Sequence, residues 1–600
     1  MTVQFSDIPE PGLPIPANVN HAVSVSLPHW QDNIDYEEGN PRITQRMVGG
    51  YPRFFYHRSV QELCGRIVKS CGVPDQDCLV FPSMSIAQRC RDFICKFYKP
   101  TDSTSSQVNE ETQSVTIQSV AVAGSSDQYT STDIRAHPVQ LFAVMFPTSA
   151  APTAKLYWQH TGEGVSSRLA EHCLKALQSV SQLSLDSDSS RSGYRHTTGS
   201  PRQTHPRYQM KSRASPSKLS PSSATPTEDI EEYLEACYGR NLPVRTAQTC
   251  KQVLRQRIAQ ALNHHPEAAQ GPTADDVYLF PTGMTAIFHA HRSLLTSRGE
   301  HQSICFGFPY TDTLKILQKF GSGCYFLGQG EGTDYDRLDE ILQRHYQDSE
   351  KQILALFCEC PGNPLLKTPD LPRLRKLADR YGFALVVDET IGNFVNLDTI
   401  TYADIVVSSL TKVFSGDSNV MGGSLALNPH GPFYATLRQT LDNNYEDSYW
   451  CEDAVFMERN SRTFHQRVQQ VNHNAEALAD LLVNHPLVSK VHYPKYTLRP
   501  LYDQLKLPGG GYGGLLSIEL TTPDVTRRFY DLLHCAKGPS LGTNFTLVSP
   551  YTILAHYHEL EWAESYGVSR YLIRCSIGLE NRDLLLQAFT TALDQAVESC

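Results

Sequence analysis

The chain has 600 residues, which is too many for one hydrophobic core, so roughly two to four domains are expected. With 40% hydrophobic and 19% charged residues the composition is that of a globular protein, and a net charge of −10 gives no indication of nucleic-acid binding. No apolar run approaches membrane-spanning length, and Met1–Glu10 lacks the basic and apolar regions of a signal peptide. The 16 cysteines are scattered, without the spacing of a secreted scaffold, which favours a reducing, cytoplasmic compartment.

Residues 1–182 are expected to form an N-terminal accessory domain of unknown role. In this region Phe54–Tyr56, Leu79–Phe81 and Leu141–Phe146 are predicted as strands or core segments, and Val60–Val73 as a helix. A polar insert rich in Ser, Thr and Gln, roughly residues 101–132, is predicted to interrupt the domain.

Residues 183–227 have a different composition and are predicted to be a disordered, Ser/Pro-rich linker. Segments such as Asp186–Ser192 and Ser215–Ser223 contain few aliphatic residues and many turn formers. Such a segment cannot bury enough apolar surface to offset the entropy of ordering it. A plain tether is the favoured interpretation, and a regulatory phosphorylation site is the alternative.

Regular structure resumes near Asp229, with helices predicted at Ile230–Cys237 and Ala247–Leu262. Strand-like runs then alternate with amphipathic helices. The predicted strands are Val277–Phe280, Ser303–Phe306, Ile353–Glu359, Ala384–Asp388 and Ile405–Ser408, and the predicted helices are Ala286–Thr296, Thr313–Phe320 and Leu371–Tyr381. This alternation predicts a mostly parallel α/β sheet with helices on both faces. We assign residues 228–430 to an N-terminal arm and this large domain.

Residues 431–600 are predicted to form a smaller α+β domain. Long helices are expected at Tyr434–Leu441 and Ser461–His485, and strands at Leu515–Leu520 and Tyr571–Ser576.

One internal similarity links the two halves of the chain. Asp77–Met84 resembles Asp276–Met284, but the first copy lacks the glycine that would open a phosphate loop, and no lysine signature follows it. Chance and a decayed duplication explain the similarity equally well, and no cofactor is expected at the first copy.

The strongest chemical signal is Lys412, which ends the apolar run Asp404–Leu410 and precedes a glycine-containing loop, Val413–Gly423. Burial at the end of a strand lowers the pKa of a lysine and exposes a nucleophilic neutral amine. The neighbouring hydroxyls of Ser409 and Thr411, together with loop amides, can hold a phosphate. This combination predicts that Lys412 holds pyridoxal phosphate as a Schiff base.

Three further segments have the residue types that this chemistry needs. Gly283 lies at a predicted strand–turn–helix junction, where the backbone can approach an anion. Asp388 ends a strand, where its carboxylate can pair with a protonated pyridine nitrogen and strengthen the ring as an electron sink; helix capping is the alternative. Arg574 lies within an apolar strand, and because a lone buried charge is costly it indicates an anion site; an internal salt bridge is the alternative.

From about Asp229 to its C-terminus the chain resembles the Cys/Met-metabolism family of pyridoxal-phosphate enzymes. Ser409-Leu410-Thr411-Lys412 is similar to the family's Ser-x-Thr-Lys signature, and Met421-Gly422-Gly423 to its Met-Gly-Gly. The long N-terminal extension is most similar to that of the fungal γ-synthases of this family. The resemblance implies PLP fold type I (aspartate aminotransferase-like), a smaller C-terminal α+β domain and an N-terminal accessory domain.

The resemblance also implies roles at the cofactor. Tyr310 is expected to stack on the pyridine ring, although Thr311 and Asp312 replace the glycines that follow it in the family. Asn363 is expected to bond the ring's phenolic oxygen. Thr282-Gly283-Met284 stands where the family has Ser-Gly-Met and is expected to bind the phosphate.

At the substrate, the resemblance implies that Arg574 clamps the α-carboxylate, with Ser540 beside it. Tyr238 and Arg240 are similar to a Tyr-x-Arg motif that reaches the phosphate of a neighbouring subunit, and Tyr238 is also expected to contact substrate. The residues that follow, Asn241-Leu242-Pro243, depart from the family pattern. A homodimer or homotetramer with shared active sites is therefore expected, without nucleic-acid or membrane partners.

No metal site is expected. Cys358-Glu359-Cys360, His289-Ala290-His291 and His556-Tyr557-His558 are pairs without a second pair at ligand spacing.

The reaction that the resemblance implies is a γ-replacement that joins an O-acyl-homoserine (acetyl or succinyl) to cysteine, giving cystathionine for methionine biosynthesis. Lys412 is expected to move protons at Cα and Cβ, with Asp388 and Tyr310 supporting the ring. The alternatives left open are an O-acetylhomoserine sulfhydrylase, a cystathionine γ-lyase, a biosynthetic-cluster γ-replacement enzyme with another nucleophile, and a catalytically silent regulatory paralogue.

Overall fold

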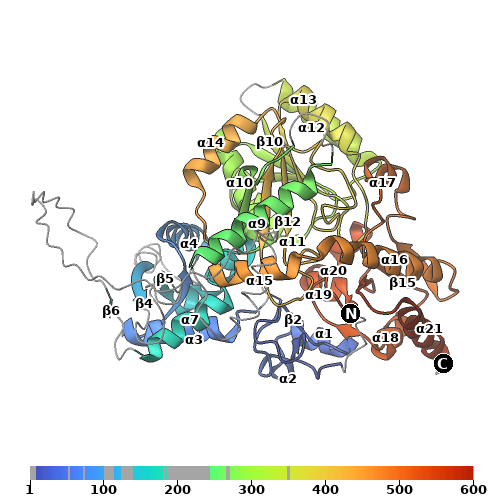
Figure 1. Cartoon of the computed structure of the whole chain (residues 1–600), viewed down its shortest axis with the longest axis horizontal. Helices are drawn as coiled ribbons and strands as arrows, with labels where there is room; N and C mark the ends of the chain where they lie inside the picture. Colours follow the sequence, from blue (N-terminus) through green and yellow to red (C-terminus); the bar gives the residue numbers. More distant parts are fainter. Residues whose placement is uncertain are drawn as a thin grey trace, which may run out of the picture.

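A computed structural model describes residues 8–51, 55–71, 74–99, 114–122, 139–179, 184–185, 244–264, 271–347 and 352–598 (Figure 1). Within these ranges the chain forms a seven-stranded, a five-stranded and a four-stranded sheet, and a two-stranded ribbon. None of the helices in these ranges has the length and apolar character needed to cross a bilayer.

The seven-stranded sheet is the centre of the large domain. Its strands, in spatial order, are β7 (Val277–Phe280), β13 (Gly423–Leu427), β12 (Ile405–Ser409), β11 (Ala384–Asp388), β10 (Ile353–Glu359), β8 (Gln302–Phe306) and β9 (Cys324–Leu327). β13 runs antiparallel to both of its neighbours, and the other pairs are parallel. The carboxyl ends of β10, β11 and β12 therefore meet at one edge, which is where an open α/β sheet binds ligands.

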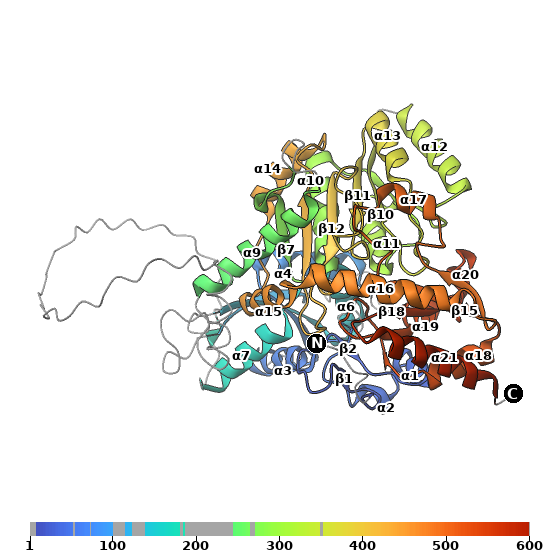
Figure 2. The same ribbon diagram turned by 45° about the vertical axis from the view of Figure 1, so that its right-hand side comes forward.

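Alternating side chains of these strands belong to two separate cores. In β7, Val277 and Leu279 pack with α9 (Val244–Leu262), α12 (Thr333–Tyr346) and α13 (Leu371–Tyr381), whereas Tyr278 and Phe280 pack with α10 (Gly283–Arg298), α11 (Thr311–Lys319) and α14 (Tyr434–Asn444). This period of two explains why the strands are apolar throughout, since helices bury both faces (Figure 2).

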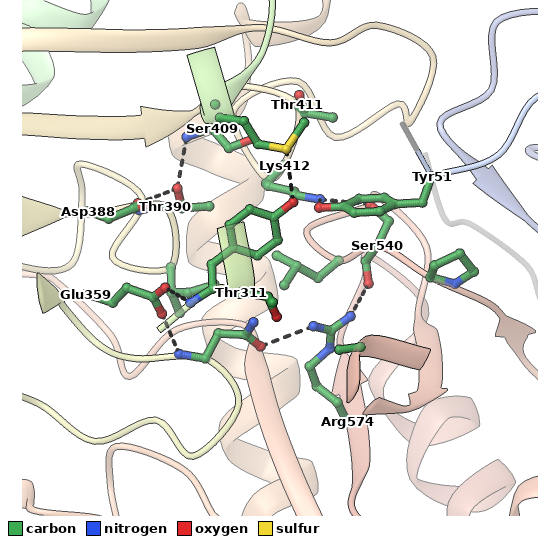
Figure 3. A pocket seen from close by; sticks show the side chains of 18 of the residues that line it. Tyr51, Thr311, Glu359, Asp388, Thr390, Ser409, Thr411, Lys412, Ser540 and Arg574 are labelled. Atoms are coloured by element: carbon green, nitrogen blue, oxygen red, sulfur yellow. Dashed lines mark hydrogen bonds between the residues drawn. The ribbon is translucent and has the colours of Figure 1, made fainter. Parts of the chain in front are cut away.

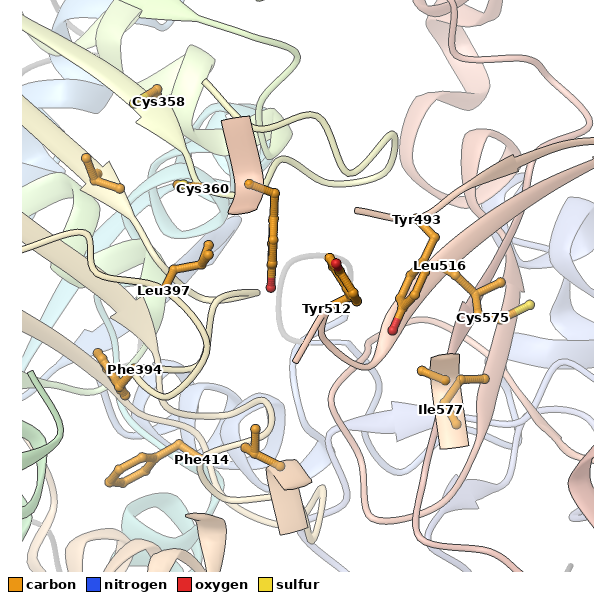
Figure 4. Close-up of a cluster of buried hydrophobic side chains, with 14 of the residues drawn as sticks. Cys358, Cys360, Phe394, Leu397, Phe414, Tyr493, Tyr512, Leu516, Cys575 and Ile577 are labelled. Atoms are coloured by element: carbon orange, nitrogen blue, oxygen red, sulfur yellow. The ribbon is translucent and has the colours of Figure 1, made fainter. Parts of the chain in front are cut away.

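The C-terminal sheet has the order β14 (Val488–His492), β15 (Leu515–Leu520), β18 (Ile573–Ser576), β17 (Leu547–Pro550) and β16 (Ala536–Lys537). The helices α16 (Phe464–Leu482), α18 (Pro523–Leu532) and α21 (Arg582–Glu598) pack around it. One apolar core is continuous between the two sheets: Phe394 and Phe414 of the large domain belong to the same cluster as Leu516 and Ile577 (Figure 4). The predicted fold class, a parallel α/β domain with a smaller α+β domain, is confirmed.

The N-terminal sheet has the order β3 (Gln76–Phe81), β5 (Val139–Pro147), β4 (Thr116–Val122) and β6 (Ser184–Leu185), with antiparallel pairing throughout. Its helices are α3 (Arg58–Cys71), α4 (Met84–Phe97), α6 (Ala151–Thr161) and α7 (Ser167–Ser179). One sequence prediction was wrong here: β4 lies inside the expected polar insert, where it pairs with β5 along its whole length and buries Val120 and Val122. Phe55 and Tyr56 are not in a strand, but their side chains pack against apolar core clusters, which is the other form that the sequence allowed. Apart from β6, the expected linker lies outside the described residues.

Residues 8–50 lie apart from this sheet and pack on the C-terminal domain. They contain β1 (Pro14–Ile15), β2 (Ser24–Val25), α1 (Trp30–Glu37) and α2 (Pro41–Thr44). The amide of Leu27 donates to the carbonyl of Lys537 (2.9 Å), and the Tyr530 hydroxyl donates to the carbonyl of Leu27 (2.8 Å). The domain boundaries themselves stay a prediction.

Trp30 anchors this segment, since its ring is 5% exposed and lies 6.0 Å from Tyr530 and 5.9 Å from Tyr571. We expect Trp30→Ala to weaken the docking of residues 8–50 by about 3–5 kcal/mol, because truncating a buried Trp removes apolar contacts and leaves a cavity. Limited proteolysis should then cleave the first 50 residues much faster than in the wild-type chain. Leu532→Ala on α18, where the side chain is 46% exposed, is the control and should leave the cleavage rate unchanged. Equal cleavage of the Trp30→Ala and wild-type chains would contradict the anchoring role.

Candidate active site

A pocket lies at the carboxyl edge of the seven-stranded sheet, between it and the C-terminal sheet (Figure 3). It brings together the predicted residues Thr282, Gly283, Met284, Tyr310, Asn363, Asp388, Ser409, Thr411, Lys412, Ser540 and Arg574. The other two predicted residues, Tyr238 and Arg240, lie outside the described residues.

Lys412 follows β12 and is almost completely buried, with 6% exposure. Its Nζ donates to the Ser540 hydroxyl (3.0 Å) and to the Tyr51 hydroxyl (3.4 Å). Burial lowers the pKa of this amine, the positive charge of Arg574 lowers it further, and Tyr51 acts in the opposite direction. The site therefore favours the neutral, nucleophilic form of Lys412.

The turn between β7 and α10 lies directly against the end of β12. Thr282 caps α10, its Oγ1 accepting from the amide of Thr285 (3.1 Å). A Cβ added to Gly283 would lie 2.6 Å from the Cβ of Ser409, so only glycine allows this approach. The first turn of α10 thus presents amides to the pocket beside the hydroxyls of Ser409 and Thr411, which suits a phosphate.

Two carboxylates lie side by side at the ends of β10 and β11, where Glu359 pairs in register with Asp388. One oxygen of Asp388 accepts from the amide (2.9 Å) and hydroxyl (2.6 Å) of Thr390, whose hydroxyl in turn accepts from the amide of Ser409 (2.9 Å). Burial raises the pKa of Asp388, which a cationic partner would reverse.

Glu359 was considered from the sequence only as part of a rejected metal pair, and its position in the pocket was missed. Burial, reinforced by the charge of Asp388, raises its pKa to about 8. Its two oxygens accept from the amides of Tyr310 and Asn363, the latter at 2.9 Å. Glu359 therefore fixes the two loops that bear the predicted ring-contacting residues. Its place at the end of a predicted strand was the only sequence signal, and its adjacency to Asp388 follows from the pairing of β10 with β11.

Arg574, on β18, is 7% exposed and bonded only to neutral acceptors in the described part of the chain. Its guanidinium donates to the side-chain oxygen of Asn363 (3.1 Å) and to the carbonyl of Ser540 (2.6 Å). It also lies 4.9 Å from the centre of the Tyr551 ring. Burial lowers the pKa of Arg574. The carbonyl of Ser540 is held in place by a backbone with φ of 104°, a conformation that costs energy for a residue with a side chain.

Neither Lys412 nor Arg574 forms an ion pair with any carboxylate in the described ranges. Two buried basic side chains in one pocket, without carboxylate partners in the described ranges, are unfavourable in their charged forms unless a ligand brings negative charge. The pocket is therefore built for an anionic ligand.

Comparisons with known proteins agree with this geometry. The profile of the Cys/Met metabolism PLP-dependent enzymes matches residues 210–594, and that of the fungal trans-sulfuration enzyme N-terminal domain matches residues 59–166. The chain therefore belongs to the Cys/Met metabolism family of PLP-dependent enzymes. Its cofactor is pyridoxal 5'-phosphate, and its fold is the predicted PLP fold type I.

Relatives match over nearly the whole chain. A cystathionine gamma-synthase of Neurospora crassa is 44% identical over 98% of this chain and 99% of its own length. A cystathionine gamma-synthase-like enzyme of Amanita muscaria is 42% identical over 98% of this chain and 97% of its own. Among solved structures, cystathionine gamma synthase from Xanthomonas oryzae pv. oryzae is 23% identical with a TM-score of 0.49, covering 60% of this chain and 90% of that one.

The pocket residues fit the cofactor of this family. A desolvated amine is available for its aldehyde, a glycine-bounded helix start with hydroxyls is available for its phosphate, and Asp388 is available for its pyridine nitrogen.

We expect Gly283→Ala to weaken cofactor binding roughly tenfold, because the added Cβ pushes the turn away from Ser409. Titration of the cofactor-free protein with pyridoxal phosphate, followed by visible absorbance, measures this affinity. Gly65→Ala in α3, where an added Cβ meets nothing within 4 Å, is the matched control. Unchanged affinity in the Gly283 variant would show that the turn does not contact the phosphate.

Glu389, next to Asp388, is fully buried, and its carboxylate accepts from the amide of Phe394 (2.9 Å) and the hydroxyl of Thr399 (2.6 Å). Burial raises its pKa from 4.5 to about 8. At a pH between these two pKa values, Glu389 has lost its proton in the unfolded chain but keeps it in the folded chain. Glu389 therefore makes the free energy of unfolding fall as the pH rises.

Glu389→Gln removes this contribution. We therefore expect the Tm of the cofactor-free variant to fall less than that of the wild-type chain between pH 5 and 8, a window set by the two pKa values of Glu389 (4.5 and about 8). Calorimetry across this pH range measures both Tm values. If the Tm of the variant and of the wild-type chain changed equally with pH, Glu389 would not be protonated in the folded chain.

Proposed function

We propose that this chain catalyses the cystathionine γ-synthase reaction, joining an O-acyl-homoserine to L-cysteine with release of the acyl group as a carboxylate. The observation that carries the proposal is the pair of buried basic side chains in one pocket, with no carboxylate partner in the described ranges: Lys412 for the cofactor and Arg574 for a substrate carboxylate. Similarity to the Neurospora crassa enzyme over both the N-terminal and the PLP-binding regions supports this choice of reaction.

Bound pyridoxal phosphate supplies an electron sink for charge that develops at the substrate's Cα. Arg574 holds the α-carboxylate in a two-point contact and so orients the Cα–H bond, with Asn363 and Ser540 fixing the guanidinium. The Lys412 amine takes the proton from Cα and moves protons at Cβ. The Cγ–O bond then breaks, the acyl carboxylate leaves with its electron pair, and the cysteine sulfur bonds to Cγ as its thiol proton is lost.

Asp388 and Glu359 have separate tasks in this scheme. Asp388 stabilises the protonated pyridine nitrogen, and the Thr390 amide and hydroxyl orient its carboxylate. Glu359 keeps the loops of Tyr310 and Asn363 in register with the ring. Tyr310, the N-cap of α11, is the ring-stacking residue of the proposal.

A homodimeric or homotetrameric assembly and a cytoplasmic setting complete the proposal. Tyr238 and Arg240 are the residues proposed to serve a neighbouring subunit. The cysteines of the described ranges are all free, as in a reducing compartment.

The test is turnover by the purified, cofactor-loaded chain with O-acetyl- or O-succinyl-homoserine, with and without cysteine. We expect cystathionine only when cysteine is present. Lys412→Ala should lose the visible absorbance of lysine-bound cofactor and about 10²–10⁴-fold or more in rate, since it removes the proton-transfer group. Arg574→Lys is the companion variant, which should keep the absorbance and raise KM.

Other products would contradict the proposed reaction and indicate a different one. Release of 2-oxobutyrate and ammonia regardless of cysteine would indicate a γ-lyase, and reaction with sulfide in preference to cysteine would indicate a sulfhydrylase. A chain that binds no pyridoxal phosphate would be a silent paralogue.

A further inference from the structure

A residue of the N-terminal region that was not among the predicted site residues lines the pocket. Tyr51 lines the cavity, its hydroxyl lies 3.4 Å from Nζ of Lys412, and its ring centre lies 4.6 Å from the same atom (Figure 3). It influences the pKa of both pocket cations, Lys412 and Arg574. Tyr51 is thus in contact with the reacting amine.

The elements next to Tyr51 are held firmly against the same site. The amide of Val23 donates to the carbonyl of Ser418 (2.8 Å), in the loop after Lys412, and the Ser24 hydroxyl donates to the carbonyl of Pro539, next to Ser540. Farther along the N-terminal region, a Cβ added to Gly162 would lie 2.2 Å from Oγ1 of Thr282. The N-terminal region therefore contacts both the lysine loop and the phosphate turn.

A buried ionic cluster fastens this region to the large domain. Glu163 accepts from Arg89 (2.5 Å) and pairs with His289 of α10 (3.0 Å). Although burial opposes ionisation, the charges of Arg89 and His289 hold the pKa of Glu163 at about 2. Arg168 pairs with Asp453 (2.9 Å) in the same way. Removing one partner of such a pair would leave a buried charge, so the contact is well determined.

The sequence around Tyr51 repeats the sequence around Tyr238. Tyr51-Pro52-Arg53 has the Tyr-x-Arg pattern of Tyr238-Gly239-Arg240. Without a gap, the next residues continue the match: Arg58 and Gln61 in the first copy occupy the positions of Arg245 and Gln248 in the second.

The described structure repeats as well. In each copy the motif precedes a helix, α3 or α9, and the aligned positions Leu63 and Cys250 are both buried, as are Ile67 and Leu254. A strand follows, β3 or β7, whose last four residues are buried and which ends in the shared Phe-Pro of Phe81 and Phe280.

The capping of the next helix is also the same. Ser83 caps α4 with φ −142° and ψ 155° and accepts from the amide three residues on. Thr282 caps α10 with φ −145° and ψ 162° and does likewise. Helix, strand and capped helix in the same order, with matching side chains, favour duplication over chance. Met84 in the first copy replaces the phosphate-turn glycine, Gly283.

We propose that the N-terminal region is a duplicated α9–β7–α10 unit that has kept its Tyr-x-Arg tyrosine, and that this residue, Tyr51, is a catalytic residue acting on Lys412 of the same chain. Each chain then completes the lysine side of its own pocket. This inference rests on the proposed function for the reaction, but its geometry concerns only Tyr51 and the amine.

The role of Tyr51 follows from its position. Lys412 is faced by the Tyr51 hydroxyl, by the Ser540 hydroxyl and by the positive charge of Arg574, with Asp388 and Tyr310 lining the same cavity. Tyr51 therefore stabilises the protonated form of the Lys412 amine, which burial disfavours, and holds the amine in position during proton transfer.

The first experiment measures capture of pyridoxal phosphate by the cofactor-free full-length chain as a function of pH, followed by visible absorbance. Tyr51→Phe keeps the ring but removes the hydroxyl. Because only the neutral amine reacts, and the variant amine has a lower pKa, we expect its capture profile to shift to lower pH. Its kcat should fall about tenfold, with a smaller change in KM, because a hydrogen bond to a charged group is lost.

Tyr56→Phe is the matched control, being the same substitution in the same segment, away from Lys412; it should leave the capture profile unchanged. An unshifted profile in Tyr51→Phe overturns the proposal. A shifted profile in a chain that makes no cystathionine would overturn the proposed reaction but leave the role of Tyr51 intact.

The second experiment separates action within a chain from action between chains. Differently tagged Lys412→Ala and Tyr51→Phe chains are co-expressed, and mixed assemblies are purified through both tags. If Tyr51 serves its own Lys412, no mixed site has both groups and activity stays at the Tyr51→Phe level. Recovery towards the wild-type rate would overturn the proposal, since a neighbouring chain would then supply the tyrosine. An active wild-type monomer would support it.

Discussion

The structure depends on keeping two basic side chains out of water without carboxylate partners in the described part of the chain. Lys412 and Arg574 lie in one pocket, buried to 6% and 7% exposure, and their described hydrogen bonds go to hydroxyl, carbonyl and amide oxygens. That arrangement costs free energy in the ligand-free chain, and the surrounding fold has to supply it. The continuous core between the two sheets and the ionic cluster around Glu163 provide the rigidity that prevents the pocket from relaxing. Ligands that bring a phosphate and a carboxylate convert this cost into binding free energy.

The sequence predicted the structure best where a residue of distinctive chemistry lies at the end of, or within, a clearly apolar strand. The strands β7, β10, β11 and β15 and the helix α13 have the predicted bounds. β7, β10 and β11 are buried, nearly continuous apolar runs, and α13 lies between a capping Asp370 and a left-handed Gly382. Lys412, Asp388 and Arg574 were predicted at the ends or in the middle of such strands, and the structure brings them to one pocket. Their roles in catalysis stay predictions.

Other features could not be found in this way. Glu359 belongs to the pocket only because β10 and β11 pair in parallel register, which is a tertiary property. β4 was hidden in a polar segment because only Val120 and Val122 are fully buried, while Thr116, Gln118 and Ser119 interrupt its apolar residues. Tyr51 lies in a loop without periodicity. Its Tyr-x-Arg pattern alone does not place it beside Lys412, since that position follows from contacts between segments hundreds of residues apart. Domain boundaries remain interpretations, since residues 8–50 pack with the C-terminal domain although they belong to the N-terminal region in sequence.

The packing of β2 and Leu27 on the C-terminal sheet has a consequence for how the protein is made. The hydrogen bonds that fix this segment join residues that are separated by 503 and 515 positions in the sequence. The first residues to leave the ribosome therefore find their partners only when synthesis is nearly finished. Throughout translation the apolar side chains of Val25, Leu27 and Trp30 lack the surface that buries them. The N-terminal segment is then a natural client for chaperones during translation, and the lysine pocket becomes complete only after the whole chain has been released.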